Sequence, residues 1–419
     1  MVYSDAVLGT VRYRFPEPVR QFATAKLEET GNAKQLKRAH FTHYLALARK
    51  EVPKLDDAPD LPLVERLSRE HGNFTAAIER ARQAGEFSDA GALVLALNSY
   101  WNETGRIGVA STVIRTLVES SPRDPAMVPV LALGLTYGLM CGKLREAFEG
   151  LPLLEAVVQA PLPPVVESRI RFAMGFTCNA VADYEGLSKY WVRAAELSAA
   201  GDPIRGRQMY WTISYSAFML GHFEDSRKFL ERALSISTPM QGWFVPMVRI
   251  NRCCVSILES EGQADPVVLN DLRSGLIDLA ALAVSLRVQL GSIAGASAFF
   301  HAGAFEDAEH WWRRALQLNK DMGGIWGSWM VLELAGRSAA LSSNYAQCAK
   351  IWGAVDAFGA QHGYRTVVPS TSRVPDRAQV RSLDPARYDR CAAEGAAVPL
   401  SRIVDETLDD PFRTVRKFP

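Results

Sequence analysis

A pair of histidines comes closest to a metal-binding pattern in this chain. His40 and His43 lie three residues apart, so a helix would place both imidazoles on one face. A structural zinc site needs four ligands, and no acidic residue or cysteine lies beside these histidines in the sequence. The six cysteines are scattered and form no C-x-x-C pair. We therefore expect neither a metal site nor a disulfide framework.

The sequence contains none of the common catalytic motifs in the residue order that their chemistry requires. The segment GSIAGAS at 291–297 has the residue types of a G-x-S-x-G nucleophile elbow in the wrong order. No G-x-x-x-x-G-K-S/T sequence occurs, so the chain lacks the loop that cradles nucleotide phosphates. Acidic residues are dispersed singly, and His310 simply flanks two tryptophans. The sequence predicts no catalytic residue, no cofactor and no enzyme activity.

Arginine and aromatic residues in helical segments are better candidates for ligand binding. A guanidinium can hold a carboxylate or phosphate in a fork, and Trp or Tyr offers a flat apolar face with a polar edge. The predicted ligand-binding residues are Arg171, Tyr210, Tyr215, Arg249, Arg252 and Trp329, with Arg169, Trp211, Asn251 and Trp326 as further candidates. Arg249 and Arg252 are three apart and should share one helix face. The alternative is that most of the aromatic residues pack between helices.

A four-position pattern predicts the helices that must hold these side chains. Phe305, Ala308, Trp312 and Ala315 have offsets of 0, 3, 7 and 10, which form one stripe of an α-helix. The same pattern starts at Ile107, Leu144, Tyr184, Phe223 and Tyr345, at intervals of about 40 residues or twice that. A further unit is expected near 264, where Asp265 and Pro266 can start a helix. Its stripe is degenerate, because Asp271 stands where a bulky apolar residue is needed.

Each striped helix, here called helix B, should follow a first helix A through a tight turn. Glycine or another turn-forming residue precedes most stripes, and each can end helix A in a left-handed cap. These residues are Gly105, Gly142, Asp183, Gly221, Gly303 and Asn344. The predicted A helices are 126–141, 166–181, 205–220, 244–260, 285–302 and 324–342.

The sequence GAFEDAEHWWRRAL at 303–316 resembles the second helix of a tetratricopeptide repeat. The period here exceeds the standard unit of about 34 residues, so we expect longer helices or loops. The resemblance implies an all-α, right-handed solenoid of about seven helical hairpins, whose concave surface is lined mainly by A helices. An irregular helical bundle is the alternative.

The N-terminal residues do not fit the repeat. TVRYRF at 10–15 alternates and is rich in β-formers, which predicts a short strand or wing. Residues 16–31 should form a helix that ends at Gly31, and 33–52 should form another. Residues 61–85 predict a helical pair that breaks near Gly72 and Asn73.

Several N-terminal blocks resemble large bacterial transcriptional regulators of the signal-transduction ATPases with numerous domains, including maltose-activator-like and LuxR-family antibiotic-regulator-like members. The blocks are RYRFPEPVRQFATAKLEETG, KRAHFTHYLALA and ERLSREHGNFTAAIERA, and AKIWGAVDAFGAQHG at 349–363 resembles the end of the family's sensor array. The family order is an ATPase, a winged-helix domain and a tetratricopeptide-like array, and many members end in a helix-turn-helix. Here the phosphate loop is absent, and the residues after 400 are too few for a helix-turn-helix. We expect either a stand-alone array or a fragment of a longer regulator.

The resemblance divides the chain into a winged-helix remnant (1–31), a helical entry segment (32–104), a repeat array (105–363) and C-terminal capping helices with a loop (364–419). We expect a non-catalytic sensor or scaffold that binds a small-molecule inducer or a protein partner in its groove. A separate ATPase or DNA-binding chain would then supply the output. The alternatives are a DNA-linked regulator that acts through the winged-helix remnant and an enzyme built on the array. A partial winged helix lacks its recognition helix, so direct base readout is not expected.

Composition agrees with a globular protein of this kind. The chain has 419 residues, of which 48% are hydrophobic and 22% charged, and a formal net charge of +1. So small a net charge predicts no strong attraction to nucleic acid or to acidic lipid. No run of 18 apolar residues occurs, and the N-terminus lacks a signal-peptide layout, so we expect a cytoplasmic protein without membrane contact.

Overall fold

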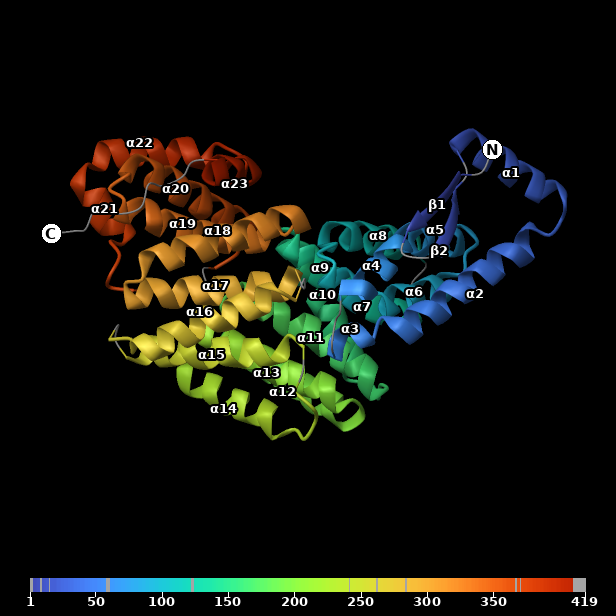
Figure 1. Cartoon of the computed structure of the whole chain (residues 1–419), viewed down its shortest axis with the longest axis horizontal. Coiled ribbons are helices and arrows are strands. Elements are labelled where there is room, and N and C mark those ends of the chain that lie inside the picture. The colour runs from blue at the N-terminus through green and yellow to red at the C-terminus, as the bar shows by residue number, and fades with distance from the viewer. Residues whose placement is uncertain are drawn as a thin grey trace.

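The computed structural model describes residues 3–7, 10–14, 16–57, 61–121, 124–240, 242–260, 263–282, 285–365, 368–369 and 371–409. Helices dominate this part of the chain and pack in serial order as a helical solenoid (Figure 1). An antiparallel hairpin of β1 (Tyr3–Val7) and β2 (Thr10–Arg14) precedes them. The predicted strand at 10–15 is thus present, and the all-α prediction holds apart from this hairpin.

The entry segment is helical, as expected. It contains α2 (Ala33–Glu51), α3 (Lys54–Asp57), α4 (Leu61–Arg69), α5 (His71–Gln83) and α6 (Phe87–Ala96), together with α7 (Asn98–Glu103), which pairs with the first striped helix of the array; α1 (Glu17–Glu29) precedes it. Gly31 has φ +71°, the left-handed conformation that ends α1. The break between α4 and α5 falls at Glu70, before the predicted Gly72 and Asn73. Those two residues lie in the first turn of α5, where the Asn73 amide donates a 2.7 Å bond to the Glu70 carboxylate.

The array consists of helices that follow one another in pairs, and the predicted A helices agree with the structure to within two residues. The pairs are α7 (Asn98–Glu103) with α8 (Ile107–Ser120), α9 (Val128–Met140) with α10 (Leu144–Val157), α11 (Pro164–Ala180) with α12 (Tyr184–Gly201), α13 (Pro203–Met219) with α14 (Phe223–Ser235), α15 (Phe244–Glu259) with α16 (Pro266–Ala280), α17 (Ser285–Ala302) with α18 (Phe305–Met322), and α19 (Ile325–Leu341) with α20 (Tyr345–His362). A short 3-10 turn, Pro125–Met127, leads into α9.

Two of the predicted turn residues act differently from the expectation. The left-handed residues before α12 and α20 are Ala182 and Ser343, each with φ 57°. Asp183 and Asn344 follow them and cap the next helix instead. The Asp183 carboxylate accepts a 3.0 Å bond from the Gly186 N–H, and the Asn344 side chain accepts one from Gln347. Glycine takes the left-handed position at the other four predicted turns.

The predicted stripes form the contact between the two helices of each pair. Ala308, Trp312 and Ala315 are fully buried, and the corresponding residues of α12 are buried in the same way. The degenerate unit is also a helix, since the Asp265 carboxylate caps α16 by accepting a 2.8 Å bond from the Val267 N–H. Its stripe lies five residues later than predicted and consists of Leu269, Leu272, Leu276 and Leu279. Asp271 is exposed because it faces away from this stripe.

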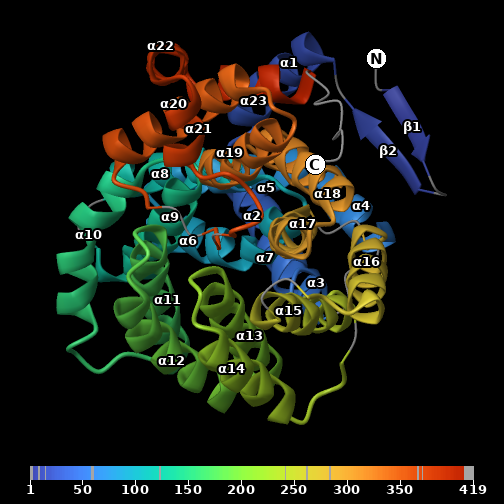
Figure 2. The same cartoon turned by 90° about the vertical axis from the view of Figure 1, so that its left-hand side faces the viewer.

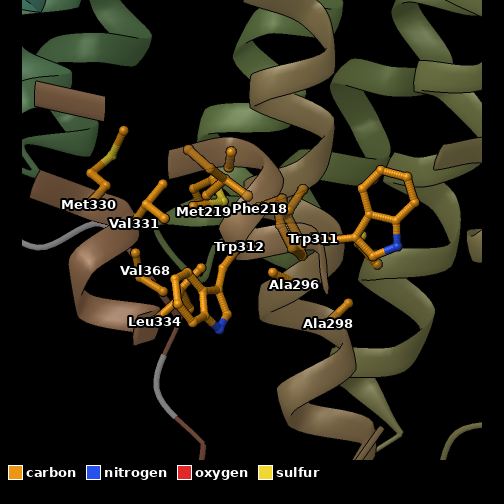
Figure 3. Close-up of a cluster of buried hydrophobic side chains, with 14 of the residues drawn as sticks. Phe218, Met219, Ala296, Ala298, Trp311, Trp312, Met330, Val331, Leu334 and Val368 are labelled. Carbon is orange, nitrogen blue, oxygen red and sulfur yellow. The ribbon is translucent and has the colours of Figure 1, made fainter. Parts of the chain in front are cut away.

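Two tryptophans of B helices insert against glycines of A helices. The Trp191 indole packs on Gly175 and donates a 2.8 Å bond to the Phe172 carbonyl. Trp352 packs on Gly336 in the same way. The absence of a Cβ at these positions brings the paired helices close together. The main buried cluster continues through the array and includes Trp312 of α18 (Figure 3).

The array curves until distant segments meet (Figure 2). The Tyr364 hydroxyl, after α20, donates a 2.6 Å hydrogen bond to the carbonyl of Leu139 in α9. The Gln208 side chain of α13 donates a 2.5 Å bond to the carbonyl of Asp56 in α3. The entry segment therefore lies against the inside of the array, and the two ends of the curve are joined by polar contacts.

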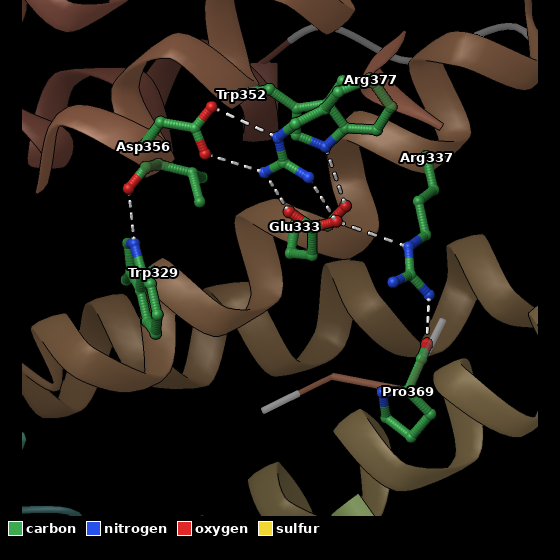
Figure 4. Close-up of polar contacts among 8 residues, drawn as sticks. Trp329, Glu333, Arg337, Trp352, Asp356, Pro369 and Arg377 are labelled. Atoms are coloured by element: carbon green, nitrogen blue, oxygen red, sulfur yellow. Dashed lines mark hydrogen bonds and ion pairs between the residues drawn. The ribbon is translucent and has the colours of Figure 1, made fainter. Parts of the chain in front are cut away.

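Three helices cover the end of the array: α21 (Arg377–Leu383), α22 (Pro385–Ala396) and α23 (Leu400–Asp409). Arg377 donates hydrogen bonds of 3.1 and 2.6 Å to the two carboxylate oxygens of Glu333, which is 4% exposed (Figure 4). Its guanidinium also stacks over the Trp352 ring, with the centroid at 4.8 Å. Arg337 donates a 2.7 Å bond to the Pro369 carbonyl. This network fixes the C-terminal helices to α19 and α20.

Within the described residues, no helix has both the length and the apolar composition needed to cross a membrane.

Candidate functional site

The inner side of the curve encloses a cavity of about 230 Å³. Its lining comes mainly from α7, α9, α11, α13, α17 and α19, all of them first helices of their pairs, with Asp56 contributed by α3. Single residues of B helices, such as Trp191, complete the wall. The cavity therefore unites the entry segment with both ends of the array.

The lining residues of two A helices follow the same spacing as the stripes. In α11 the spacing is kept by Arg169, Phe172, Phe176 and Asn179, and in α13 by Arg205, Gln208, Thr212 and Tyr215; further lining residues, such as Ser168 and Trp211, flank these two sets. Offsets of 0, 3, 7 and 10 place each set on one face of its helix. The cavity wall is thus a second helical stripe that combines polar and apolar residues.

Aromatic rings form one wall of the cavity. Phe172 stacks on Trp191, with ring centroids 5.3 Å apart and planes inclined by 10°. Phe176 meets Trp326 edge to face at 5.2 Å. Trp211 and Tyr215 lie on the neighbouring α13. Flat apolar surface of this kind suits a planar ligand, since stacked and edge-to-face aromatic pairs add to the free energy of burial.

Two arginines of the cavity wall have no ion-pair partner. Among the described residues, the side chains of Arg169 and Arg205 form no hydrogen bond or ion pair. Burial and the neighbouring positive charge of Arg205 lower the pKa of Arg169 to about 10, so its guanidinium remains charged at neutral pH. A partly buried cation without a counter-ion is unfavourable, and an anion beside it would offset that cost.

Asp56 supplies negative charge on the same wall. Its carboxylate accepts a 2.7 Å bond from the Ser99 hydroxyl. Burial raises the pKa of Asp56, while the charge of Arg205 and the Ser99 bond act in the opposite direction. The net charge of these lining groups is positive, because two arginines without ion-pair partners lie on the same wall as one carboxyl group.

The third arginine that lines the cavity, Arg287, forms an ion pair with Glu103. Its Nε lies 3.6 Å from the Oε1 of Glu103, which is 1% exposed. Burial raises the pKa of Glu103 to about 7, against the lowering effect of Arg287, and Asp56 raises it further. The Arg287 guanidinium also stacks over Trp243 at 4.0 Å. Arg287 is therefore a structural link between α17 and α7 as well as a lining residue.

Only one of the six predicted ligand-binding residues lines the cavity. This residue is Tyr215, whose hydroxyl donates a 3.1 Å bond to the Leu290 carbonyl, and burial raises its pKa. Three of the further candidates, Arg169, Trp211 and Trp326, also line it. Asn251 is buried and donates a 3.1 Å bond to Ser214.

The other predicted residues lie outside the cavity lining. Arg171 is bound to Glu167 at 2.7 Å, on its own helix. Tyr210 is 4% exposed and packs on Phe229 of α14. Trp329 is 2% exposed and donates a 2.8 Å bond to the carbonyl of Val355, in α20. These two aromatics therefore pack between the paired helices, which was the alternative considered for them.

Arg249 and Arg252 lie outside the cavity, because none of its lining residues comes from α15. Arg249 forms an ion pair with Asp278 of α16 at 2.8 Å. Arg252 is exposed and borders a surface groove between α14 and α15. The i, i+3 spacing indicated a shared helix face, but it carried no information on whether that face was turned toward the interior of the curve.

Sequence reasoning missed Asp56, Phe172, Arg205 and Arg287. The signal that marks Phe172 and Arg205 is the polar and apolar stripe along the A helices. Asp56 and Arg287 have no such signal, because they join the wall through contacts between segments far apart in the chain. Among the described residues, no group of three or more His, Cys, Asp and Glu side chains is arranged to hold a metal ion.

Comparison with known proteins found no family model that matches the chain and no matching curated protein.

Proposed function

We propose that this chain is a non-catalytic sensor module whose enclosed cavity binds a small organic molecule. In this proposal the helical pairs are tetratricopeptide-like repeats, about seven in a right-handed array, and the N-terminal hairpin with α1 is a winged-helix remnant. The resemblance of the N-terminal blocks to bacterial transcriptional regulators supports the role of a sensor. A separate ATPase or DNA-binding chain would supply the output.

The observation that carries this proposal is the cavity of about 230 Å³, with its aromatic wall and its two unpaired arginines. Ligand sites are concave and mainly apolar, with a few placed polar groups, and this cavity has that composition. The predicted pair of arginines lacks such a cavity. Arg249 is bound to Asp278, and Arg252 is exposed beside a surface groove.

A route from ligand to output follows from the position of Asp56. This residue belongs to the entry segment, yet its backbone carbonyl is bound by Gln208 of the array. A ligand that contacts both walls binds most tightly when they are together, so binding favours the joined state of the two segments. The sensor would thus report occupancy through the position of its N-terminal helices.

The test is to fill the cavity without changing the rest of the array. Thr212 lines the cavity, and its hydroxyl bonds only the Gln208 carbonyl of its own helix, at 2.9 Å. Thr212→Phe should therefore insert a ring into the cavity. Thr112→Phe is the matched control, since Thr112 is exposed and makes the same kind of bond, at 3.1 Å, to Gly108.

The assay is a thermal-shift screen of a metabolite library, followed by calorimetry on the hits. A ligand at one hundred times its Kd stabilises the protein by about 2.7 kcal/mol. We expect at least one compound to stabilise the wild type and Thr112→Phe but not Thr212→Phe. If every hit binds Thr212→Phe as tightly as the wild type, the cavity is not the binding site and the proposal is wrong.

A further inference from the structure

Arg169 and Arg205 come from the adjacent first helices α11 and α13, and both line the cavity. They are close enough for the charge of Arg205 to lower the pKa of Arg169. Neither has an ion pair in the described part of the chain. Most other arginines on these and the next helices are paired, such as Arg171 with Glu167 and Arg273 with Asp307. The cavity wall thus brings together two guanidinium groups without ion-pair partners from consecutive first helices.

The charge balance sets the charge of the ligand. Arg287 lies 3.6 Å from Glu103, which balances its charge above about pH 7, where Glu103 is ionised. Arg169 and Arg205 then face the single carboxyl group of Asp56, which leaves one excess positive charge when Asp56 is ionised. One negative charge on the ligand would neutralise the wall. A guanidinium donates two parallel hydrogen bonds to a carboxylate, so a carboxylate fits this geometry better than a diffuse anion.

The aromatic wall and the volume set the shape of the ligand. Phe172 lies three residues from Arg169 on the same helix face, so the rings begin directly beside the arginine. A cavity of roughly 150 Å³ holds benzene. The volume here, about 230 Å³, is therefore suited to one ring with a short side chain or to two fused rings.

We infer that the cavity selects a monoanionic aromatic carboxylate, with its carboxylate held by Arg169 and Arg205 and its ring against Phe172 and Phe176. This inference rests on the proposed function and specifies its ligand class. Arg169 lies three residues from Phe172 on the same helix face and provides the main contact. Asp56 limits the charge, because a dianion would be repelled by its carboxylate.

The experiment compares aromatic carboxylates with their neutral primary amides, which have nearly the same shape. The probes are benzoate, phenylacetate, 2-naphthoate and indole-3-carboxylate, each paired with its amide. Binding is measured by calorimetry at low ionic strength and at about pH 8, above the pKa of Glu103. We expect at least one carboxylate to bind at least tenfold more tightly than its amide, and added salt to reduce this difference.

Arg169→Gln should abolish the preference for the carboxylate while the amide keeps its affinity. Arg171→Gln is the matched control, because Arg171 lies on the same helix, is bound to Glu167 and does not line the cavity. This control should bind like the wild type. A circular dichroism spectrum and a melting temperature establish that each variant is folded.

The inference is overturned if no carboxylate of the series binds, if the amides bind equally well, or if Arg169→Gln keeps the preference. These results leave the proposed function standing when a neutral compound of the library binds the wild type but not Thr212→Phe. The proposed function itself fails only when no compound shows that dependence on Thr212. The two failures are therefore distinguishable.

Discussion

Gly175 is the position where one added methyl group tests most directly how the paired helices pack. A Cβ at this position would lie within 3.0 Å of three atoms of the Trp191 indole. The ring has little freedom to move, because it is 1% exposed, stacks on Phe172 and donates a 2.8 Å bond to that residue's carbonyl. Gly175→Ala should therefore separate α11 from α12 or displace the ring.

The expected cost follows from three contributions. Overpacking costs about 1–3 kcal/mol, and loss of the indole hydrogen bond costs about 1 kcal/mol more. Alanine in place of glycine returns up to about 1 kcal/mol through helix propensity. The net expectation is a destabilisation of about 2 kcal/mol. Gly138→Ala is the control, since its Cβ would meet only Lys143, at an ordinary distance of 3.7 Å, and it should be neutral or slightly stabilising.

A double-mutant cycle with Trp191→Ala isolates the contact. Removal of the indole costs about 3–5 kcal/mol by itself, but it also removes the atoms that the methyl group added by Gly175→Ala would strike. In that background Gly175→Ala should gain up to about 1 kcal/mol, which gives a coupling free energy of about 3 kcal/mol. Urea denaturation followed by far-ultraviolet circular dichroism measures all four proteins. Equal costs of Gly175→Ala in both backgrounds would refute this account of the packing.

Two further predictions concern buried charges. Glu103 should titrate near pH 7 when folded and near 4.5 when unfolded, so the folded state binds the extra proton and loses about 3 kcal/mol of stability as pH rises between these values. Glu103→Gln cannot ionise, so its free energy of unfolding should not show this decrease. If the free energies of unfolding of the variant and the wild type change in parallel from pH 4.5 to about 8, the prediction is wrong. Arg377→Met should cost about 3 kcal/mol, because it leaves the carboxylate of Glu333 buried with only the more distant Arg337 at 3.6 Å. The control is Arg402→Met, whose side chain is 72% exposed and should change the urea midpoint little; a similar midpoint for both variants would reject the role of the buried pair.

The sequence predicted the individual helices well, because their signals are local. The stripe at Phe305, Ala308 and Trp312 has a period that only a helix satisfies, and the structure buries Ala308 and Trp312 against the preceding helix. Asp265 was predicted to start a helix, and its side chain caps α16. The predicted stripe of α16 lies five residues too early, because the connection before this helix is longer than the average repeat interval allows.

The candidate site was much harder to predict. Tyr215, one of the predicted ligand-binding residues, lines the cavity, but Tyr210, on the same helix, packs against α14. The difference is five residues, which is more than one turn and places the two side chains on different faces. Residue type alone could not separate them, since tyrosine suits both a ligand site and a contact between helices.

The sequence by itself determined that the chain is a series of helical pairs, since the stripes and the turn residues act over a few residues of neighbouring chain. Only the tertiary structure decided which helix faces enclose the cavity. That outcome depends on how far the small rotation between successive pairs accumulates before Tyr364 reaches Leu139 and Asp56 reaches Gln208. Such long-range contacts have no local period, and they leave Arg169 unpaired inside a cavity rather than on an open surface.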